Sequence, residues 1–411
     1  MSQKPGRKDT AQRGPNCCLE LEDGTRLAGS GFGHRGQTSG EVVFTTGMTG
    51  YVESLTDPSY RGQILVFTYP LIGNYGVPAQ DDLDRFESSR IQVAGVVVAF
   101  AHSDASHARA ARSLKDWLAS EQVPGIEGID TRHLTMRLRE KGTMLGRIVP
   151  LIESKGAREE ERKGGREEAG RSQKVDGNSK NQGIEESSRQ TEPSNPGVLE
   201  SSNPAPFFDP NKVNIVAETA GQTPERFGSG GKRVILVDCG VKRSIRRELL
   251  ARGIEVFQVP WDFDYTGEQF SGILVSNGPG NPEQCRSTIE ILRRAMALNR
   301  PIFGICLGAQ LMALAAGART YKLRYGHRGQ NQPCLETDTE HCRLTSQNHG
   351  FAIDASTLPA DWSVWFLNAN DGSVEGIRHK RRPFSAVQFH PEASPGPLDS
   401  RDLFDAFVRQ L

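Results

Sequence analysis

The chain has 411 residues, and its 50 lysine and arginine residues are balanced by 50 aspartate and glutamate residues. This length exceeds what one hydrophobic core usually organises, so we expect two domains joined by a linker. A net charge of zero gives no overall field that would attract nucleic acid or an anionic membrane, and we expect neither as a partner.

Apolar runs and cysteines exclude further classes of protein. The longest apolar runs, such as residues 96–101 and 311–316, are far shorter than the roughly 18 residues that cross a bilayer. The start of the sequence is polar and contains no apolar segment typical of a secretory signal, so we expect a cytoplasmic protein. The seven cysteines are scattered without a C-x-x-C pair, which predicts reduced thiols and no metal site.

Short β-like runs and amphipathic segments fill residues 17–152. Extended runs are expected at 41–45, 63–68 and 91–100, and helices at 108–120 and 131–141. The pattern predicts a smaller domain of mixed β and α structure. Residues 153–208 are rich in Glu, Lys, Arg, Gly and Ser. Because such a segment buries too little apolar surface to offset its ordering entropy, we expect a disordered linker or insertion.

Strands alternate with helices across residues 232–411. We expect strands at 233–237, 255–259, 272–276, 301–306 and 385–389, with helices at 242–252, 286–298 and 307–316. This alternation predicts an α/β domain with a doubly wound, mostly parallel sheet. Ligands of such sheets bind beyond the carboxyl ends of the strands. A last helix that packs on the core is expected from apolar side chains at helical spacing, namely Leu403, Phe404, Phe407, Val408 and Leu411.

Residues 301–316 have the layout of a nucleophile elbow. An apolar strand leads into Gly304-Ile-Cys306-Leu-Gly308, and helix-forming residues follow directly. The helix start stabilises a thiolate at Cys306, so we expect its pKa to lie below the usual value of about 8.5. The backbone N–H of Leu307 is placed to bind an oxyanion. The pattern therefore predicts a cysteine nucleophile.

Three other segments follow expected strands or carry polar groups. His390 comes directly after the strand at 385–389, and Glu392 is placed to accept the proton of one ring nitrogen, so that the other faces the thiol. In the segment 276–282, Gly278 and Gly280 either expose backbone N–H groups to a ligand or form a tight turn. The side chains of residues 347–351 are suited to line a small polar pocket.

These segments resemble two related families. Residues 276–282, 304–310, 347–351 and 390–397 are similar to the signature segments of class I glutamine amidotransferases. The carbamoyl-phosphate synthetase small subunit is the more specific resemblance, and it rests on GEVVFTTGMTGY at 40–51, TDPSY at 56–60, YPLIGN at 69–74, GIDTR at 128–132 and HPEASPGP at 390–397. The resemblance covers residues 19–411 apart from the region near 153–204.

The resemblance implies a chemistry and a partner. Cys306 would attack the side-chain amide of glutamine, with His390 as general base and then acid and Glu392 as the acid that orients it. A large synthetase subunit, joined in a heterodimer or a higher assembly, would use the ammonia with bicarbonate and ATP, for arginine biosynthesis, pyrimidine biosynthesis or both. No cofactor is expected on this chain, since residues 228–233 lack the P-loop pattern, while ATP and Mg²⁺ are expected on the large subunit. The residues implied to hold glutamine are Gly278, Gly280, Leu307, Gln310, Asn348, Gly350 and Phe351.

Two departures from the family pattern keep alternatives open. Gly47 stands where the family usually has a serine that holds glutamine, and Ala309 stands where the elbow usually has a histidine. A catalytically silent regulatory subunit is therefore one alternative. The glutaminase of another amidotransferase is a second, and a cysteine hydrolase acting on γ-glutamyl bonds alone is a third.

Overall fold

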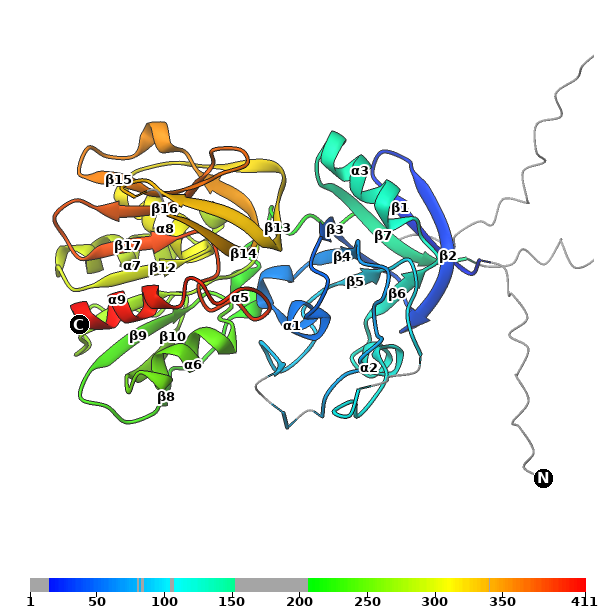
Figure 1. The fold of residues 1–411 in the computed structure, drawn as a ribbon, viewed down its shortest axis with the longest axis horizontal. Coiled ribbons are helices and arrows are strands. Elements are labelled where there is room, and N and C mark those ends of the chain that lie inside the picture. The colour runs from blue at the N-terminus through cyan, green and yellow to red at the C-terminus, as the bar shows by residue number, and fades with distance from the viewer. Residues whose placement is uncertain (1–14, 80, 83–84, 104–106, 152–205, 340) are drawn as a thin grey trace, which may run out of the picture.

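The computed structural model describes residues 15–79, 81–82, 85–103, 107–151, 206–339 and 341–411. The charged segment predicted at 153–208 lies outside the described residues, except for its last three. Two bodies are seen in Figure 1, one built from the described residues between 15 and 151 and one from those between 206 and 411.

The first body is a closed barrel with the strand order β1-β2-β6-β5-β4-β3-β7. Parallel pairs join β3 to β4, β4 to β5 and β5 to β6, and antiparallel pairs close the rest. The helices are α1 (Tyr51–Thr56), α2 (Leu114–Ser120) and α3 (Thr131–Lys141). The strands are β1 (Cys17–Leu21), β2 (Arg26–Gly33), β3 (Thr38–Thr45), β4 (Gln63–Phe67), β5 (Gly95–Val97), β6 (Pro124–Glu127) and β7 (Met144–Pro150).

Two elements of this domain are shorter than the sequence predicts by several residues. Of the strand expected at 91–100, only β5 is formed, because only these central residues pair with β4 and β6. The expected helix at 108–120 begins at Leu114, where the hydroxyl of Ser113 caps it by accepting a bond from the N–H of Asp116 at 3.1 Å. The preceding residues instead donate backbone hydrogen bonds to the carbonyl of Val77.

A ten-stranded sheet forms the second body, in the order β14-β13-β15-β16-β17-β12-β11-β9-β10-β8. Its centre, from β17 to β10, is parallel, and antiparallel strands extend both edges. The parallel strands are β9 (Arg233–Asp238), β10 (Glu255–Pro260), β11 (Gly272–Val275), β12 (Ile302–Ile305) and β17 (Phe384–Val387). The antiparallel strand at one edge is β8 (Glu225–Phe227). The extension consists of β13 (Thr320–Glu336), β14 (Cys342–Ile353), β15 (Trp362–Asn368) and β16 (Val374–His379). The predicted α/β class is confirmed.

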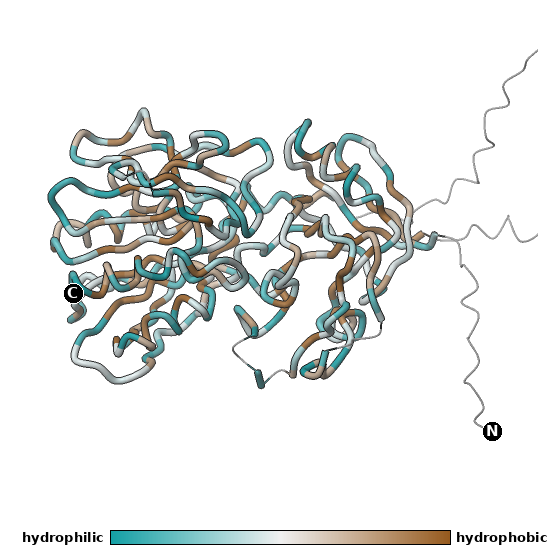
Figure 2. The backbone as a smooth tube through the Cα atoms, viewed as in Figure 1, coloured by the Kyte–Doolittle hydropathy of each residue, from teal (hydrophilic) through white to brown (hydrophobic). Residues whose placement is uncertain are grey.

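Helices cover both faces of this sheet, as in a doubly wound fold. Alternate residues of the central strands belong to two separate apolar clusters, one with α7 and α8 and one with α6 and α9. Figure 2 shows hydrophobic residues concentrated in the strands of each body and hydrophilic residues in the outer loops. The helices are α5 (Val216–Thr219), α6 (Arg243–Ala251), α7 (Arg286–Ala297), α8 (Leu307–Ala316) and α9 (Asp402–Gln410).

The last helix, α9, packs on the core as predicted. Phe404 and Phe407 are buried, and their ring centroids lie 6.1 and 5.7 Å from that of Phe303 on β12. Among the described residues, no helix combines the length and the apolar character needed to cross a membrane.

The sheet order decides where the predicted site residues meet. β12 pairs in parallel with β11 on one side and with β17 on the other. Because parallel strands end at the same edge, the residues after all three strands converge there.

Candidate active site

The turn between β12 and α8 carries Cys306. Its backbone has φ 53° and ψ −106°, a conformation that L-residues rarely adopt, and the residue is buried. The two glycines of this turn are required by close packing. A Cβ on Gly308 would lie 2.1 Å from the carbonyl oxygen of Val275, and one on Gly304 would lie 2.7 Å from Met312 Sδ. The backbone therefore has the strand-turn-helix geometry that the sequence predicts.

His390 and Glu392 follow β17, the strand beside β12. His390 Nδ1 lies 2.6 Å from Glu392 Oε1, and both side chains are buried. Burial opposes a charge on the imidazole, but the carboxylate of Glu392 raises the pKa of His390 to about 10, and the sulfur of Cys306 acts in the same direction. The turn that carries Cys306 lies beside the end of β17, because the backbone N–H of Cys306 donates to the carbonyl of Val387 at 2.8 Å. The structure therefore brings the three predicted catalytic residues together.

A small pocket opens beside Cys306. It is lined by all seven residues predicted to hold glutamine, namely Gly278, Gly280, Leu307, Gln310, Asn348, Gly350 and Phe351. The amide of Gln310 is fixed within it, because its Nε2 donates to the carbonyl of Phe351 at 2.9 Å and to Gln388 Oε1 at 3.0 Å. A larger cavity of about 330 Å³ lies beside Gly50 and Pro395, and none of the predicted catalytic residues lines it.

Side chains of the barrel domain reach this pocket, which sequence reasoning missed. Asp57 Oδ2 accepts a hydrogen bond from the side chain of Asn348 at 3.1 Å. The buried carboxylate of Glu41 lies 2.7 Å from Lys322 Nζ, and both residues line the pocket. The sequence did offer a reason to consider both carboxylates, since Glu41 and Asp57 lie in segments that carry the family resemblance. The pocket therefore lies between the two domains.

Comparison with known proteins finds family matches in two parts of the chain. Residues 19–148 match the family model of the carbamoyl-phosphate synthase small chain, CPSase domain, and residues 235–410 match that of class I glutamine amidotransferases. The chain is 44% identical to the carbamoyl phosphate synthase arginine-specific small chain of Aspergillus niger, over 94% of this chain and 78% of that one. The chain belongs to the carbamoyl-phosphate synthase small-chain family.

Longer members of the family also match. This small chain is 45% identical to the multifunctional protein pyrABCN of Emericella nidulans over 96% of its own length, and 43% identical to the multifunctional protein CAD of Squalus acanthias over 95%. It spans only 17% and 16% of the length of these two relatives.

The two departures from the small-chain pattern lie in different surroundings. Gly47 lies beside Gln330, whose Nε2 atom would be 2.7 Å from a Cβ added at this position. Ala309 is completely buried in α8 and belongs to the apolar core. Neither residue is among those that line the pocket beside Cys306.

Lys242 is a fourth polar residue of the small-chain site, and sequence reasoning missed it. Its ammonium lies 3.0 Å from Glu392 Oε1 and is almost completely buried. Burial opposes the charge, but the carboxylates of Glu392, Glu87 and Asp57 raise the pKa of Lys242. Burial likewise opposes the charge on Glu392, yet Lys242 and His390 lower its pKa to about 2. A signal was present, because Lys242 lies between β9 and α6, beyond the carboxyl end of a parallel strand.

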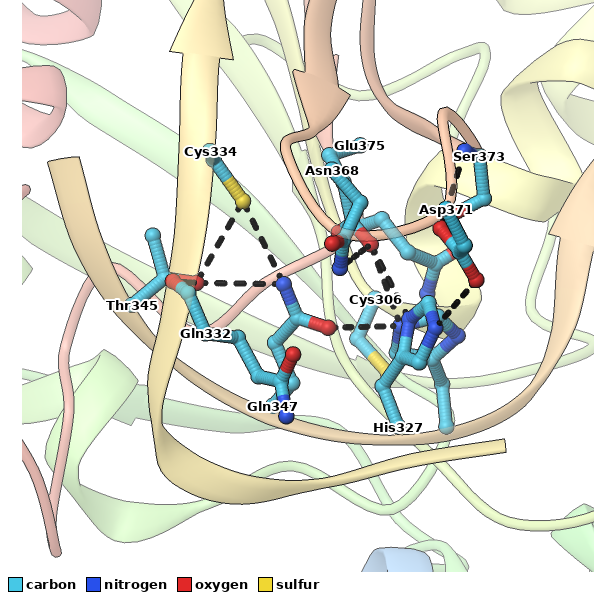
Figure 3. Close-up of polar contacts among 12 residues, drawn as sticks. Cys306, His327, Gln332, Cys334, Thr345, Gln347, Asn368, Asp371, Ser373 and Glu375 are labelled. Atoms are coloured by element: carbon cyan, nitrogen blue, oxygen red, sulfur yellow. Dashed lines mark hydrogen bonds and ion pairs between the residues drawn. The ribbon is translucent and has the colours of Figure 1, made fainter. Parts of the chain in front are cut away.

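Two histidines and two carboxylates form a polar cluster beside β14, the strand that carries several of the pocket residues (Figure 3). His327 Nε2 lies 2.9 Å from Asp371 Oδ2, and His327 Nδ1 lies 3.2 Å from Glu375 Oε1. Burial opposes a charge here, but these carboxylates raise the pKa of His327. His349 Nδ1 donates to the carbonyl of Phe351 at 2.8 Å, which fixes the β14 backbone.

Three residues of this cluster are of the types that bind metal ions. In the described ranges, the ligand atoms of His327, His349 and Glu375 lie within 4.8 Å of one another. Both ring nitrogens of His327 already contact carboxylates. A ring protonated on both nitrogens donates a hydrogen bond to each carboxylate, so the contacts are accounted for without a metal ion. We therefore interpret the cluster as a protonated histidine between two carboxylates.

Proposed function

We propose that this chain hydrolyses L-glutamine to glutamate and supplies the ammonia to a carbamoyl-phosphate synthetase large chain. The observation that supports the proposal is the convergence of Cys306, His390 and Glu392 beside a pocket lined by all seven residues that the family resemblance implies for glutamine. The family model over residues 19–148 favours this function over the glutaminase of another amidotransferase.

The first half of the reaction forms a thioester. The thiolate of Cys306 attacks the side-chain amide carbon of glutamine, and the backbone N–H of Leu307 stabilises the oxyanion of the tetrahedral intermediate. The C–N bond then breaks as the imidazolium of His390 donates a proton to the leaving nitrogen, which departs as ammonia. Glu392 holds the ring through Nδ1, so that Nε2 carries this proton.

The second half releases glutamate. His390, now neutral, accepts a proton from a water molecule as the water attacks the thioester carbon. The carbon–sulfur bond breaks, glutamate leaves, and Cys306 and the imidazolium are restored. Glu392 stabilises the positive charge on the ring whenever the ring is protonated, because the two groups form a buried ion pair. Lys242 opposes that charge on the ring and instead keeps Glu392 ionised through its own contact at 3.0 Å.

The large chain would carry the remaining chemistry. In this proposal it binds ATP and Mg²⁺, activates bicarbonate, and consumes the ammonia to make carbamoyl phosphate for arginine or pyrimidine biosynthesis. The name of one relative, an arginine-specific small chain, supports the first of these pathways. The small chain and the large chain form a heterodimer or a higher assembly.

The test is to purify the chain with a candidate large chain and to measure glutamate release and carbamoyl-phosphate formation. Wild-type protein should support synthesis from glutamine, whereas Cys306→Ala should support synthesis from free ammonia alone. A wild-type rate of glutamate release equal to that of Cys306→Ala, with ammonia-dependent synthesis intact, would identify a silent regulatory subunit. Glutamine hydrolysis that the large chain does not stimulate would favour an independent γ-glutamyl hydrolase.

A further inference from the structure

Glu87 belongs to the barrel domain, and its carboxylate is completely buried. One carboxylate oxygen, Oε2, accepts hydrogen bonds from the backbone N–H of Ser244 at 3.0 Å and from its hydroxyl at 2.6 Å. The other oxygen, Oε1, accepts a bond from the hydroxyl of Ser394 at 2.7 Å and one from Arg247 at 3.2 Å. The carboxylate therefore joins two segments of the second domain, the start of α6 and the loop that follows His390.

Both segments hold the catalytic imidazole. Lys242, directly before α6, contacts Glu392 and donates to the carbonyl of Ala393 at 2.5 Å. Ala393 and Ser394 have φ of 56° and 55°, in the left-handed region that side chains other than glycine rarely adopt. Such a loop keeps its conformation only while surrounding contacts hold it. The bond from Ser394 to Glu87 is one of these contacts.

Glu87 also replaces a missing helix cap. The cap position of α6 is Lys242, whose side chain makes no capping bond. The first N–H groups of a helix have no partner within the helix, and the helix dipole favours a negative charge beside them. Glu87 supplies both the acceptor and the charge, and its backbone carbonyl accepts a bond from the N–H of Arg243 at 2.9 Å. The helix start that carries Lys242 is therefore fixed from the other domain.

We infer that Glu87 is a positioning residue of the glutaminase site, through which the barrel domain holds His390 and Glu392 in their active arrangement. The inference rests on the proposed function and adds a route of regulation. A partner that shifts the barrel domain moves Glu87, and with it both segments that fix the imidazole. Binding of the large chain would change glutamine hydrolysis by this route without contacting the catalytic residues.

The experiment uses Glu87→Gln and Ser394→Ala in the full chain. Glu87→Gln keeps the side-chain volume but removes the charge, so kcat for glutamate release should fall about 10- to 100-fold, since each 1.4 kcal/mol of a lost charged hydrogen bond is a factor of ten. KM should change less than about threefold, because Glu87 does not line the glutamine pocket. Ser394→Ala should lower kcat in the same direction by a smaller factor.

A second readout reports on the site geometry alone. The pH dependence of Cys306 alkylation by iodoacetamide should shift in Glu87→Gln, because the imidazole beside the sulfur is less firmly held. The matched control is Glu20→Gln, which removes a carboxylate paired with Arg26 and Arg147 on the barrel. That variant should be destabilised to heat but should keep the wild-type kcat and alkylation profile.

The outcomes are distinguishable. Wild-type kcat and an unchanged alkylation profile in both Glu87→Gln and Ser394→Ala would overturn the inference. If Glu87→Gln does not fold, the inference is tested by Ser394→Ala, which removes only the hydroxyl that donates to Glu87 and should disturb folding less. If the wild-type chain fails to hydrolyse glutamine, the proposed function fails, while the alkylation profiles still show whether Glu87 positions the imidazole.

Discussion

The charge of Glu392 should stabilise the fold as well as the active site. Its Oε1 atom lies 2.6 Å from His390 Nδ1 and 3.0 Å from Lys242 Nζ, in a completely buried position. Although burial favours the neutral acid, Lys242 and His390 lower the pKa of Glu392 from 4.5 to about 2. A depression of this size corresponds to about 3 kcal/mol of folding stability at neutral pH. Because the pKa is depressed, this stability is present above about pH 4.5 and is lost as the pH falls towards 2.

Replacing Glu392 by Gln should therefore have two measurable effects. Urea denaturation at pH 7 should show a loss of about 3 kcal/mol or more, since the variant leaves the buried Lys242 without the carboxylate that contacts it. The difference from wild type should shrink below about pH 4.5. Glutamate release should fall about 100- to 10,000-fold, because the ring loses the group that fixes its tautomer. Glu392→Asp, which keeps the charge, is the control for the pH effect. A Glu392→Gln protein with the wild-type free energy of unfolding and a glutaminase rate within threefold of wild type would refute the reasoning.

Four further results are expected. Gly47→Ser restores the residue that the family motif usually carries, but position 47 does not line the pocket and its Cβ would lie 2.7 Å from Gln330 Nε2, so KM for glutamine should change less than about threefold; a KM lowered about tenfold, as one added hydrogen bond of about 1.5 kcal/mol would give, would contradict this. Gly308→Ala should cost about 3 kcal/mol or more in urea denaturation, because its Cβ would meet backbone at 2.1 Å, whereas Gly267→Ala, with open space around it, should be neutral. Phe404→Ala should lower the free energy of unfolding by about 3 to 5 kcal/mol, since the ring is completely buried, and a loss below 1 kcal/mol would show that α9 does not hold the core. Because Glu392 raises the pKa of His390 to about 10, the stabilisation from its charge should be complete below about pH 6.5 and lost as the pH rises towards 10; His390→Asn should lack this decline in denaturation measured at pH 7 and 9.5.

Several parts of the fold were predictable because their signals are local. α3 and α8 have the bounds that the sequence predicts, since Asp130 caps one by accepting a bond from the N–H of His133 and Gly317 ends the other with φ 101°. The convergence of Cys306 and His390 also followed from sequence, because both come directly after strands of a parallel sheet.

Long-range packing decided what the sequence pattern left open. Short strands with weak alternation close into a barrel through pairing between distant residues, such as β1 with β7. The long antiparallel strands β13 to β16 likewise depend on partners across the sheet.

The amino-acid order alone determined the chemistry of the site, since a cysteine in a glycine-bounded turn and a histidine followed by a carboxylate are adjacent-residue patterns. Only the tertiary structure decided which distant side chains complete it. The local sequence around Lys242 and Asp57 indicates a place near the site, but it does not specify which distant groups these residues and Glu87 contact. Their roles arise from burial between two domains, where a charge is stable only beside an opposite charge or a hydrogen-bond donor, and that juxtaposition exists only after both domains have folded.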